Sequence, residues 1–260
     1  MTCAAVRVTV AQTKGSTPRD VGAEMLIWGD RQSGSIGGGM LEFEAAKQAR
    51  EMLANGPQKM QMEQSLGPDL GQCCGGHVML EFEQMEKGTM TAPENNTPLW
   101  IFGAGHVGRA LVQILAPMAR FDITLIDTST ARMPTVLPNG VTAITNAQMQ
   151  SLVSQAPANA HHFIMTMSHG FDLEICDALL NHRFAYAGLI GSKTKWARFR
   201  TKLKKRGHSA DDIKRITCPI GDPTLGKEPQ AIAVGISHGL LLECTKTESE
   251  ADIAHGAGEI

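Results

Sequence analysis

The sequence predicts an α/β protein in which a small α+β domain is followed by a Rossmann-like domain with a parallel sheet. From residue 99 onward, apolar strands alternate with helical segments, and this alternation is typical of a parallel sheet. Before that point, strands with period-two apolar patterns flank a single helical segment. Between the two parts lies a polar stretch with two prolines and no periodicity. We therefore place an N-terminal domain at 1–86, a linker at 87–98, the Rossmann-like domain at 99–245 and a disordered tail at 246–260.

The N-terminal elements follow from the spacing of apolar residues. Val6, Val8 and Val10 alternate with small or polar residues, which predicts a strand. The segment HVMLEFEQM alternates in the same way and predicts another. Between them, apolar residues recur every three or four positions from Leu41 to Met52, which predicts a helix.

The C-terminal elements have a different order. LWIFGAGHVGRALVQILAPM (99–118) reads as a strand, a glycine turn and a helix. FDITLID (121–127) is the next strand, HHFIMTM and FAYAGLI are two more, and a helix follows at 229–243. Because each strand is followed by a turn or helix and then another strand, we expect parallel pairing.

Charge and hydropathy exclude several classes of function. The formal net charge is −2 and the pI is near 6.5, so no overall basic field attracts nucleic acid. No apolar run approaches the 18 residues of a membrane span, and the N-terminus lacks a signal-peptide pattern. We expect a cytoplasmic protein with no nucleic-acid or membrane partner. Its six cysteines have no CxxC spacing, which disfavours a zinc site.

The strongest motif in the C-terminal half is GAGHVG, which fits the GxGxxG pattern of nucleotide-binding turns. Gly103, Gly105 and Gly108, with His106 between them, follow a strand and open a helix, and Asp127 ends the next strand. Glycines admit phosphates, the helix N-terminus carries partial positive charge, and the acid binds a ribose hydroxyl. We predict a bound nucleotide or NAD, and the acid argues against NADP. The alternative is that the glycines only allow tight strand–helix packing.

Further candidate ligand residues follow other strands of the predicted sheet. Open α/β sheets bind ligands at the carboxyl ends of their strands. The predicted site residues at these positions are Ser168, His169, Gly191, Ser192, Lys193 and Lys227. The alternatives are structural: a histidine with no chemical role, and lysines that face water.

Three glycine-rich loops crowd the N-terminal half. They are GSTPRDVG (15–22), the loop that contains Gly37, Gly38 and Gly39, and GQCCGG (71–76). Glycine lets backbone approach a ligand closely, so the three loops predict a shared pocket. Three ordinary turns are the alternative.

Six motifs in this order resemble the xanthine dehydrogenase accessory proteins, the XdhC/CoxI family. They are GSTPRDVGAEML, GSIGGGMLE, GQCCGGHVMLEFE, LWIFGAGHVGRALVQIL, GLIGSKTKWARFR and PIGDPTLGKEPQAIAV, and they cover most of the chain. The resemblance implies a family-specific N-terminal domain, a Rossmann domain and an accessory rather than a catalytic role. The implied task is to bind molybdenum cofactor (molybdopterin), take part in its sulfuration and insert it into a xanthine dehydrogenase-type molybdenum hydroxylase of purine catabolism.

That resemblance gives a role to the adjacent cysteines of GQCCGG. Soft thiolates suit molybdenum dithiolene chemistry and can hold or pass sulfur. We therefore predict that Cys73 and Cys74 lie near the molybdenum and that Gln72 hydrogen-bonds the pterin. An inert buried pair is the alternative. Some relatives carry a further cysteine after the triple glycine, where this chain has Met40.

The expected partners are a xanthine dehydrogenase-type enzyme, a cysteine desulfurase and a second copy of the chain. We also expect the Gln72–Gly76 loop to face the carboxyl ends of the Rossmann strands, in one chain or across the homodimer. Two other classes stay open: an NAD-dependent oxidoreductase, which GAGHVG and Ser168–His169 favour, and a nucleotide-sensing regulator.

Overall fold

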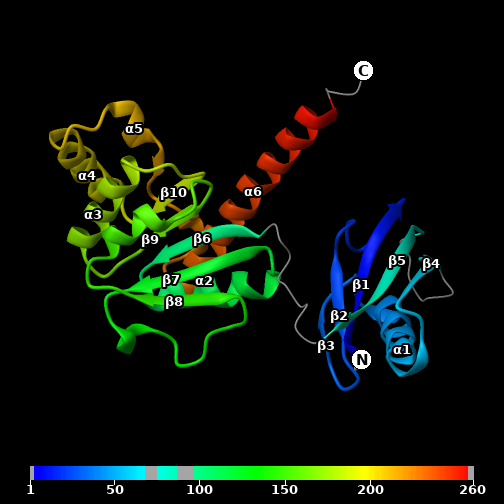
Figure 1. Ribbon diagram of the computed structural model, residues 1–260. Coiled ribbons are helices and arrows are strands. Elements are labelled where there is room, and N and C mark those ends of the chain that lie inside the picture. The colour runs from blue at the N-terminus through cyan, green and yellow to red at the C-terminus, as the bar shows by residue number, and fades with distance from the viewer. Residues whose placement is uncertain (1–2, 68–74, 87–95, 257–260) are drawn as a thin grey trace. The chain divides into compact units, whose positions relative to one another are not determined.

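The computed structural model describes residues 3–67, 75–86 and 96–256 and divides into two compact units, Met1–Thr91 and Ala92–Ile260 (Figure 1). Each unit has its own sheet and its own core. The predicted α/β fold class, with a parallel sheet in the second half, is confirmed.

Unit 1 is an antiparallel sheet with one helix on one face. The strands lie in the order β3-β2-β1-β5-β4, and the helix is α1 (Gly39–Asn55). The strands are β1 (Cys3–Lys14), β2 (Glu24–Ile27), β3 (Gln32–Gly34), β4 (Lys59–Ser65) and β5 (His77–Glu86). The valines of β1 and the apolar residues of β5 pack against Leu41, Ala45 and Ala49 of α1. The period-two and helical patterns therefore meet in one core, as the sequence predicts.

Unit 2 is a parallel six-stranded sheet in the order β11-β10-β9-β6-β7-β8. Its strands are β6 (Thr97–Phe102), β7 (Phe121–Asp127), β8 (Val141–Thr145), β9 (His161–Ile164), β10 (Tyr186–Leu189) and β11 (Ile216–Thr217). Its helices are α2 (His106–Leu115), α3 (His169–Leu180), α4 (Lys193–Lys205), α5 (Ala210–Lys214) and α6 (Pro229–Gly256). Short 3-10 helices lie at Ala116–Met118, Thr130–Arg132, Met149–Gln155 and Pro223–Leu225.

The order of these strands places the topological switch point of the sheet between β6 and β9. From β6 the chain proceeds outward through β7 and β8, then returns to β9 and proceeds the other way. At such a switch point the loops after the two central strands diverge, and ligands bind there in open α/β sheets. Successive residues of β6 enter two cores: Leu99 and Ile101 pack with α2 and α6, whereas Trp100 and Phe102 pack with α3.

Two features differ from the sequence prediction. Helix α6 extends to Gly256, beyond the boundary expected at 245. Strand β8 carries no buried residue, so the period-two and apolar-run criteria do not detect it. Among the helices that the structure describes, none has the length and apolar character needed to cross a membrane.

Candidate functional site

The glycines of GAGHVG have two separate structural roles. Gly103 has φ 119°, and a Cβ there would lie 2.4 Å from the carbonyl oxygen of Met165 in the loop after β9. A Cβ at Gly108 would lie 2.0 Å from the carbonyl oxygen of Gly103. A Cβ at Gly105 would meet nothing within 4 Å. The outer two glycines therefore serve packing, and the middle one leaves open space over the turn, as a phosphate cradle requires.

Helix α2 begins at this open space. Its N-cap is Gly105, so no side chain accepts a hydrogen bond from the first-turn N–H groups. Uncapped N–H groups and the partial positive charge of the helix favour an anion. The exposed His106 is the first residue of the helix. The motif is therefore needed for strand–helix packing, and it also leaves open space at Gly105.

Asp127 does not stand free at the end of β7. It is 4% exposed, and its carboxylate accepts hydrogen bonds from the backbone N–H of Ala104 (2.8 Å) and of Thr128 (2.7 Å). The Thr128 hydroxyl donates a further bond, and Arg132 Nε lies 3.2 and 3.3 Å from the two carboxylate oxygens. Asp127 therefore holds the glycine turn and the following loop together.

Arg109 fixes the glycine turn from the other side. Its Nε donates to the carbonyl of Ala104 (2.8 Å), and its Nη2 donates to the carbonyl of Arg132 (2.6 Å). The two peptide groups that flank Ala104 are thus hydrogen-bonded by Asp127 and Arg109, which presets the turn. Sequence reasoning missed Arg109 and Arg132, and the only local signal for the latter is a cation five residues after Asp127.

A buried ion pair joins the first turns of α3 and α4. Lys195 Nζ lies 2.6 Å from Asp172 Oδ2 and donates to the carbonyl of Ile190 (2.8 Å), with side chains 10% and 1% exposed. The other oxygen of Asp172 accepts from the N–H and hydroxyl of Thr166. Because a Cβ at Gly191 would lie 2.7 Å from Lys195 Cδ, that glycine makes room for the lysine stem. The pair was not predicted as part of the site.

The predicted residues beside this pair have mixed roles. Ser168 and Ser192 are the N-caps of α3 and α4, so their hydroxyls accept hydrogen bonds from the helix backbone. His169 is exposed, with its ring against Phe199. Lys193 is exposed in the first turn of α4. These positions belong to the same sheet edge as the glycine turn, as the sequence predicts for consecutive parallel strands.

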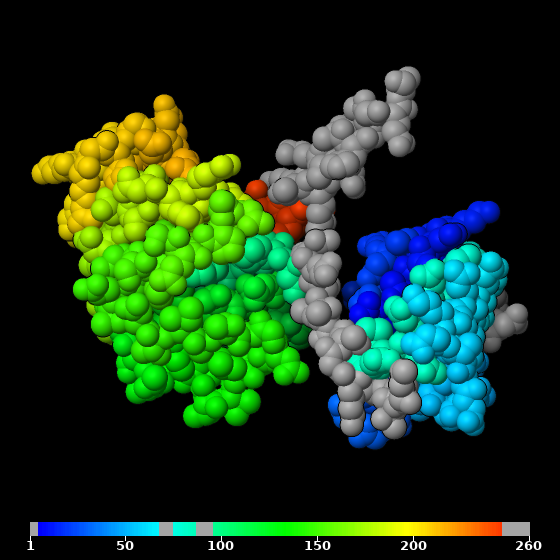
Figure 2. Space-filling model, in the orientation of Figure 1, coloured from blue at the N-terminus to red at the C-terminus, as the bar shows by residue number. Residues whose placement is uncertain are grey.

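Lys227 and the distal part of α4 lie apart from this cluster. Lys227 is exposed before α6, and its backbone N–H donates to Glu228. None of the hydrogen bonds and ion pairs found among the described residues joins it to the glycine turn. Figure 2 shows the α4–α5 segment in yellow to orange at the surface of unit 2, where Lys202, Lys204 and Lys205 face water.

In unit 1 the glycine-rich loops meet. Gly76 packs so closely on the 15–22 loop that a Cβ there would lie 2.0 Å from the carbonyl oxygen of Ser16, and Gly75 forms a bridge with Ser16. Gly37 packs on the same loop: a Cβ there would lie 2.3 Å from Pro18 Cγ. The 15–22 loop is thus the common neighbour of the triple-glycine loop and of the C-terminal end of the cysteine loop.

The triple-glycine turn already holds an anion of its own. Glu42 Oε1 accepts from the backbone N–H groups of Ile36 (3.0 Å) and Gly38 (2.9 Å) and from the Ser35 hydroxyl. Partial burial acts to raise the pKa of this carboxyl, but the hydrogen bonds from Ser35 and the turn backbone outweigh it and lower the pKa. Gly37, Gly38 and Gly39 all have positive φ. Since Glu42 uses these N–H groups, the turn is shaped from within and packs against Pro18.

Gln72, Cys73 and Cys74 lie outside the described residues, so their roles stay predictions, as does the expectation that their loop faces the Rossmann crevice. Two thiols that the structure does describe are poor candidates. Burial raises the pKa of Cys218 to about 11 and raises that of Cys176 as well. Within the described ranges, no group of three or more His, Cys, Asp or Glu side chains is arranged to hold a metal ion.

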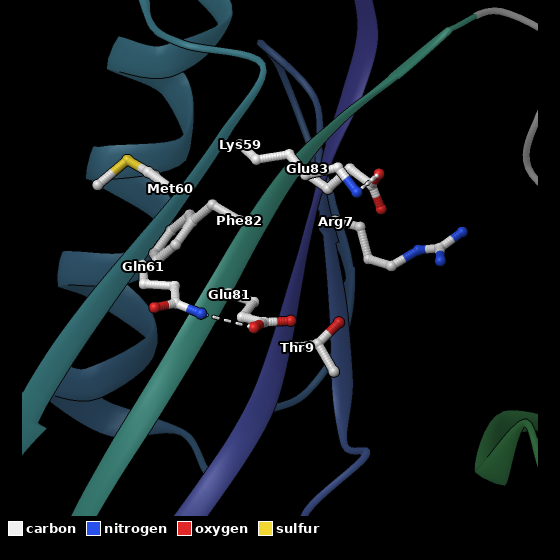
Figure 3. Close-up of a pocket in the computed structure, with 8 residues that line it drawn as sticks. All are labelled: Arg7, Thr9, Lys59, Met60, Gln61, Glu81, Phe82 and Glu83. Carbon is white, nitrogen blue, oxygen red and sulfur yellow. Dashed lines mark hydrogen bonds and ion pairs between the residues drawn. The ribbon is translucent and has the colours of Figure 1, made fainter.

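The open face of the unit 1 sheet carries a shallow hollow of about 540 Å³ (Figure 3). Lys59 pairs with Glu83 at 2.6 Å, and Gln61 donates to Glu81 at 2.7 Å. Arg7 points away from these pairs, and its Nε lies 3.9 Å from a carboxylate oxygen of Glu24 on β2. The carboxylates that line the hollow are therefore already paired, which is typical of a solvated sheet face rather than a catalytic centre.

Unit 2 has a parallel sheet with open space over the glycine turn at its switch point, and a small domain of clustered glycine loops precedes it. Together they define a two-domain protein with a Rossmann domain. The chain belongs to the XdhC and CoxI family. The profile of the XdhC Rossmann domain matches residues 99–238, and that of the XdhC and CoxI family matches residues 2–63. The predicted family is confirmed.

Two similar proteins extend over most of the chain. The protein YqeB of Escherichia coli strain K12 is 26% identical over 244 residues, which are 92% of this chain and 43% of that protein. The chain thus spans less than half the length of this relative. A crystal structure described as a xanthine dehydrogenase from Bacillus halodurans superposes with a TM-score of 0.69 at 19% identity, covering 93% of this chain and 92% of the other. At that identity the likeness shows the fold. Family membership supports a role in the xanthine dehydrogenase system.

Proposed function

We propose that the chain is an accessory protein that binds molybdenum cofactor, carries it during sulfuration and delivers it to a xanthine dehydrogenase-type molybdenum hydroxylase. The observation that carries this proposal is the meeting of the family's loops in unit 1. The 15–22 loop packs on both the triple-glycine turn and Gly75–Gly76, which end the cysteine loop. This packing fixes one end of the segment that presents Cys73 and Cys74 in the proposal.

The cofactor has two kinds of chemical group, and each of the two units, taken by itself, offers residues that suit one of them. Its phosphate suits the open space at Gly105 and the uncapped start of α2. Its molybdenum, bound by dithiolene sulfur, suits the soft thiolates of Cys73 and Cys74. Gln72 provides both a donor and an acceptor for the pterin edge. In this proposal Lys193, in the first turn of α4, adds positive charge near the anionic ligand, whereas Lys227 lies apart from the glycine turn.

Partners follow from the same chemistry. A sulfurated cofactor needs a sulfur donor, for which a cysteine desulfurase is the proposed source, and the loaded cofactor needs an acceptor enzyme. We also propose a homodimer. The oxidoreductase alternative gains no support from His169, because no described side chain is hydrogen-bonded to its ring, and a hydride-transfer site needs a positioned acid or base.

The test is the composition of the protein purified from a molybdenum-replete host. Molybdenum by mass spectrometry, pterin by fluorescence after release, and bound nucleotide are measured on the same sample. We expect molybdenum and pterin in near-equal amounts in the parent chain and their loss in the Cys73→Ala/Cys74→Ala double variant. Cys218→Ala, which removes a thiol whose pKa is raised to about 11, is the matched control and retains both. A parent chain without pterin, or a double variant that retains it, contradicts the proposal.

A further inference from the structure

The ribose corner of the Rossmann crevice is already filled by protein. In NAD-binding Rossmann domains, the acid at the end of the second strand accepts hydrogen bonds from the ribose hydroxyls. Here that acid is Asp127, and its two oxygens accept from Ala104, from Thr128 and from Arg132. A ribose diol would have to displace one of these donors. The cradle at Gly105 fits a phosphate, but Asp127 does not fit the diol.

Arg132 reaches from one side of the crevice to the other. Its Nε pairs with Asp127 at the end of β7, and its Nη1 lies 2.8 Å from the sulfur of Met167 in the loop after β9. Strand β6, which carries the glycine turn, lies between β7 and β9 in the sheet. The guanidinium therefore crosses the carboxyl end of β6, where the ligand of a Rossmann domain binds.

The backbone around Arg132 is built to hold it there. Its carbonyl accepts from Arg109 Nη2 at 2.6 Å, and Arg109 Nε is bound in turn to the glycine turn. Ser129 caps the short 3-10 helix that ends at Arg132. The corner thus contains two guanidinium groups and one carboxylate, and the uncapped start of α2 adds partial positive charge. The sign of the corner is positive, whereas Asp127 alone would make it negative.

We propose that Arg132 is a specificity-determining residue that selects a ligand with a phosphate monoester at the ribose corner over a ligand with a ribose diol. The inference rests on the proposed function in that it takes the crevice as the phosphate-binding part of the molecule. The Met167 thioether is a weak hydrogen-bond acceptor, so Arg132 makes a stronger hydrogen bond when a phosphate oxygen replaces the sulfur. The planar guanidinium binds phosphate through two parallel N–H groups while its Nε stays on Asp127. The proposal differs here from the sequence-based expectation that the acid at Asp127 argues against NADP.

The test uses NADPH and NADH, which differ only in the 2′-phosphate. Dissociation constants for both are measured by fluorescence titration of the purified full chain at one fixed ionic strength. We expect the parent chain to bind NADPH about tenfold more tightly than NADH or better, as charge-assisted hydrogen bonds to one phosphate predict. In Arg132→Ala the preference disappears, because the phosphate loses its partner and Asp127 becomes available to the diol. Arg132→Gln, which keeps the chain length without the charge, gives the same result.

A matched control separates specific contact from net charge. Arg200→Ala removes an exposed arginine of α4 and should leave the NADPH to NADH ratio unchanged. The proposal is overturned if the parent chain binds NADH as tightly as NADPH, if it binds neither, or if Arg132→Ala keeps the preference. Molybdenum and pterin content is measured independently. If the chain prefers NADPH but contains no pterin, the proposed function is rejected and the role of Arg132 stands. If the chain contains pterin but shows no preference for NADPH, the proposed function stands and the role of Arg132 is rejected.

Discussion

Replacing His162 with Phe should remove a large part of the acid sensitivity of unit 2. His162 is 0% exposed on β9, among the rings of Trp100, Phe102 and Phe184. Neither of its ring nitrogens has a hydrogen-bond partner in the described structure. Burial, together with the neighbouring histidines, lowers its pKa from 6.5 to about 3. The folded protein thus keeps this ring neutral at pH values where the unfolded chain protonates it.

The sign and the size follow from proton linkage. Between pH 6.5 and 3 the unfolded state binds one more proton at His162 than the folded state, so the free energy of unfolding falls as the pH falls. Each pH unit well inside that window costs about 1.4 kcal/mol. From pH 7 to pH 4.5 the loss from this one residue is about 2.5 kcal/mol, which is a large part of the stability of an ordinary domain.

The measurement is urea unfolding at pH 7 and at pH 4.5, followed by tryptophan fluorescence. A Trp28→Phe background confines the signal to Trp100 and Trp196 in unit 2. The change in unfolding free energy between the two pH values should be smaller in His162→Phe by about 2.5 kcal/mol. Any overpacking by the larger ring changes the free energy of unfolding equally at both pH values, so it cancels in the difference. Phe163→Leu, a core substitution without a titrating group, should keep the parent's pH dependence. Equal pH dependence in His162→Phe and the parent would refute the reasoning.

Three further predictions concern the loops that shape the site. Lys195→Met should destabilise unit 2 by about 3–5 kcal/mol, because it leaves the buried Asp172 carboxylate unpaired. Adding Asp172→Asn in the same chain should restore most of this stability. If urea unfolding shows that the losses of the two single variants add up in the double variant, the reasoning is contradicted. Gly105→Ala should keep the parent's melting temperature but weaken the binding of phosphate ligands, because its Cβ enters the open cradle. Gly108→Ala should lower the melting temperature, because its Cβ would lie 2.0 Å from a carbonyl oxygen. Equal melting temperatures of the two variants would count against this account. Glu42→Gln should lower the free energy of unfolding by about 1 kcal/mol at pH 7, because its hydrogen bonds to the triple-glycine turn are weaker. Because the pKa of Glu42 is lowered in the folded state, this loss should vanish as the pH falls below the ordinary carboxyl range. A loss that persists in acid would contradict the charge-based account.

The sequence by itself determined the elements that local patterns encode. The apolar run Leu99–Phe102, the glycines after it and the helix that follows specify one strand–turn–helix unit with its cradle. In the same way, alternating valines and a helical stripe specify the core of unit 1. These features depend on neighbours a few residues apart, and so a single chain read in order contains them. The sequence did not predict strand β8, because an edge strand with no buried residue has no such apolar pattern.

Only the tertiary structure decided what the charged residues near the cradle do. Asp127 matches the ribose acid of a nucleotide site by spacing, yet its oxygens are taken by the glycine turn and Arg132. Asp172 and Lys195 stand 23 residues apart, and they meet because parallel crossovers bring the first turns of α3 and α4 to one edge of the sheet. A charged side chain forms an ion pair or hydrogen bond with whichever partner the fold brings within about 3 Å. Distance along the sequence says little about which residue that partner is. The cradle is therefore local, and its specificity is set by contacts between strands.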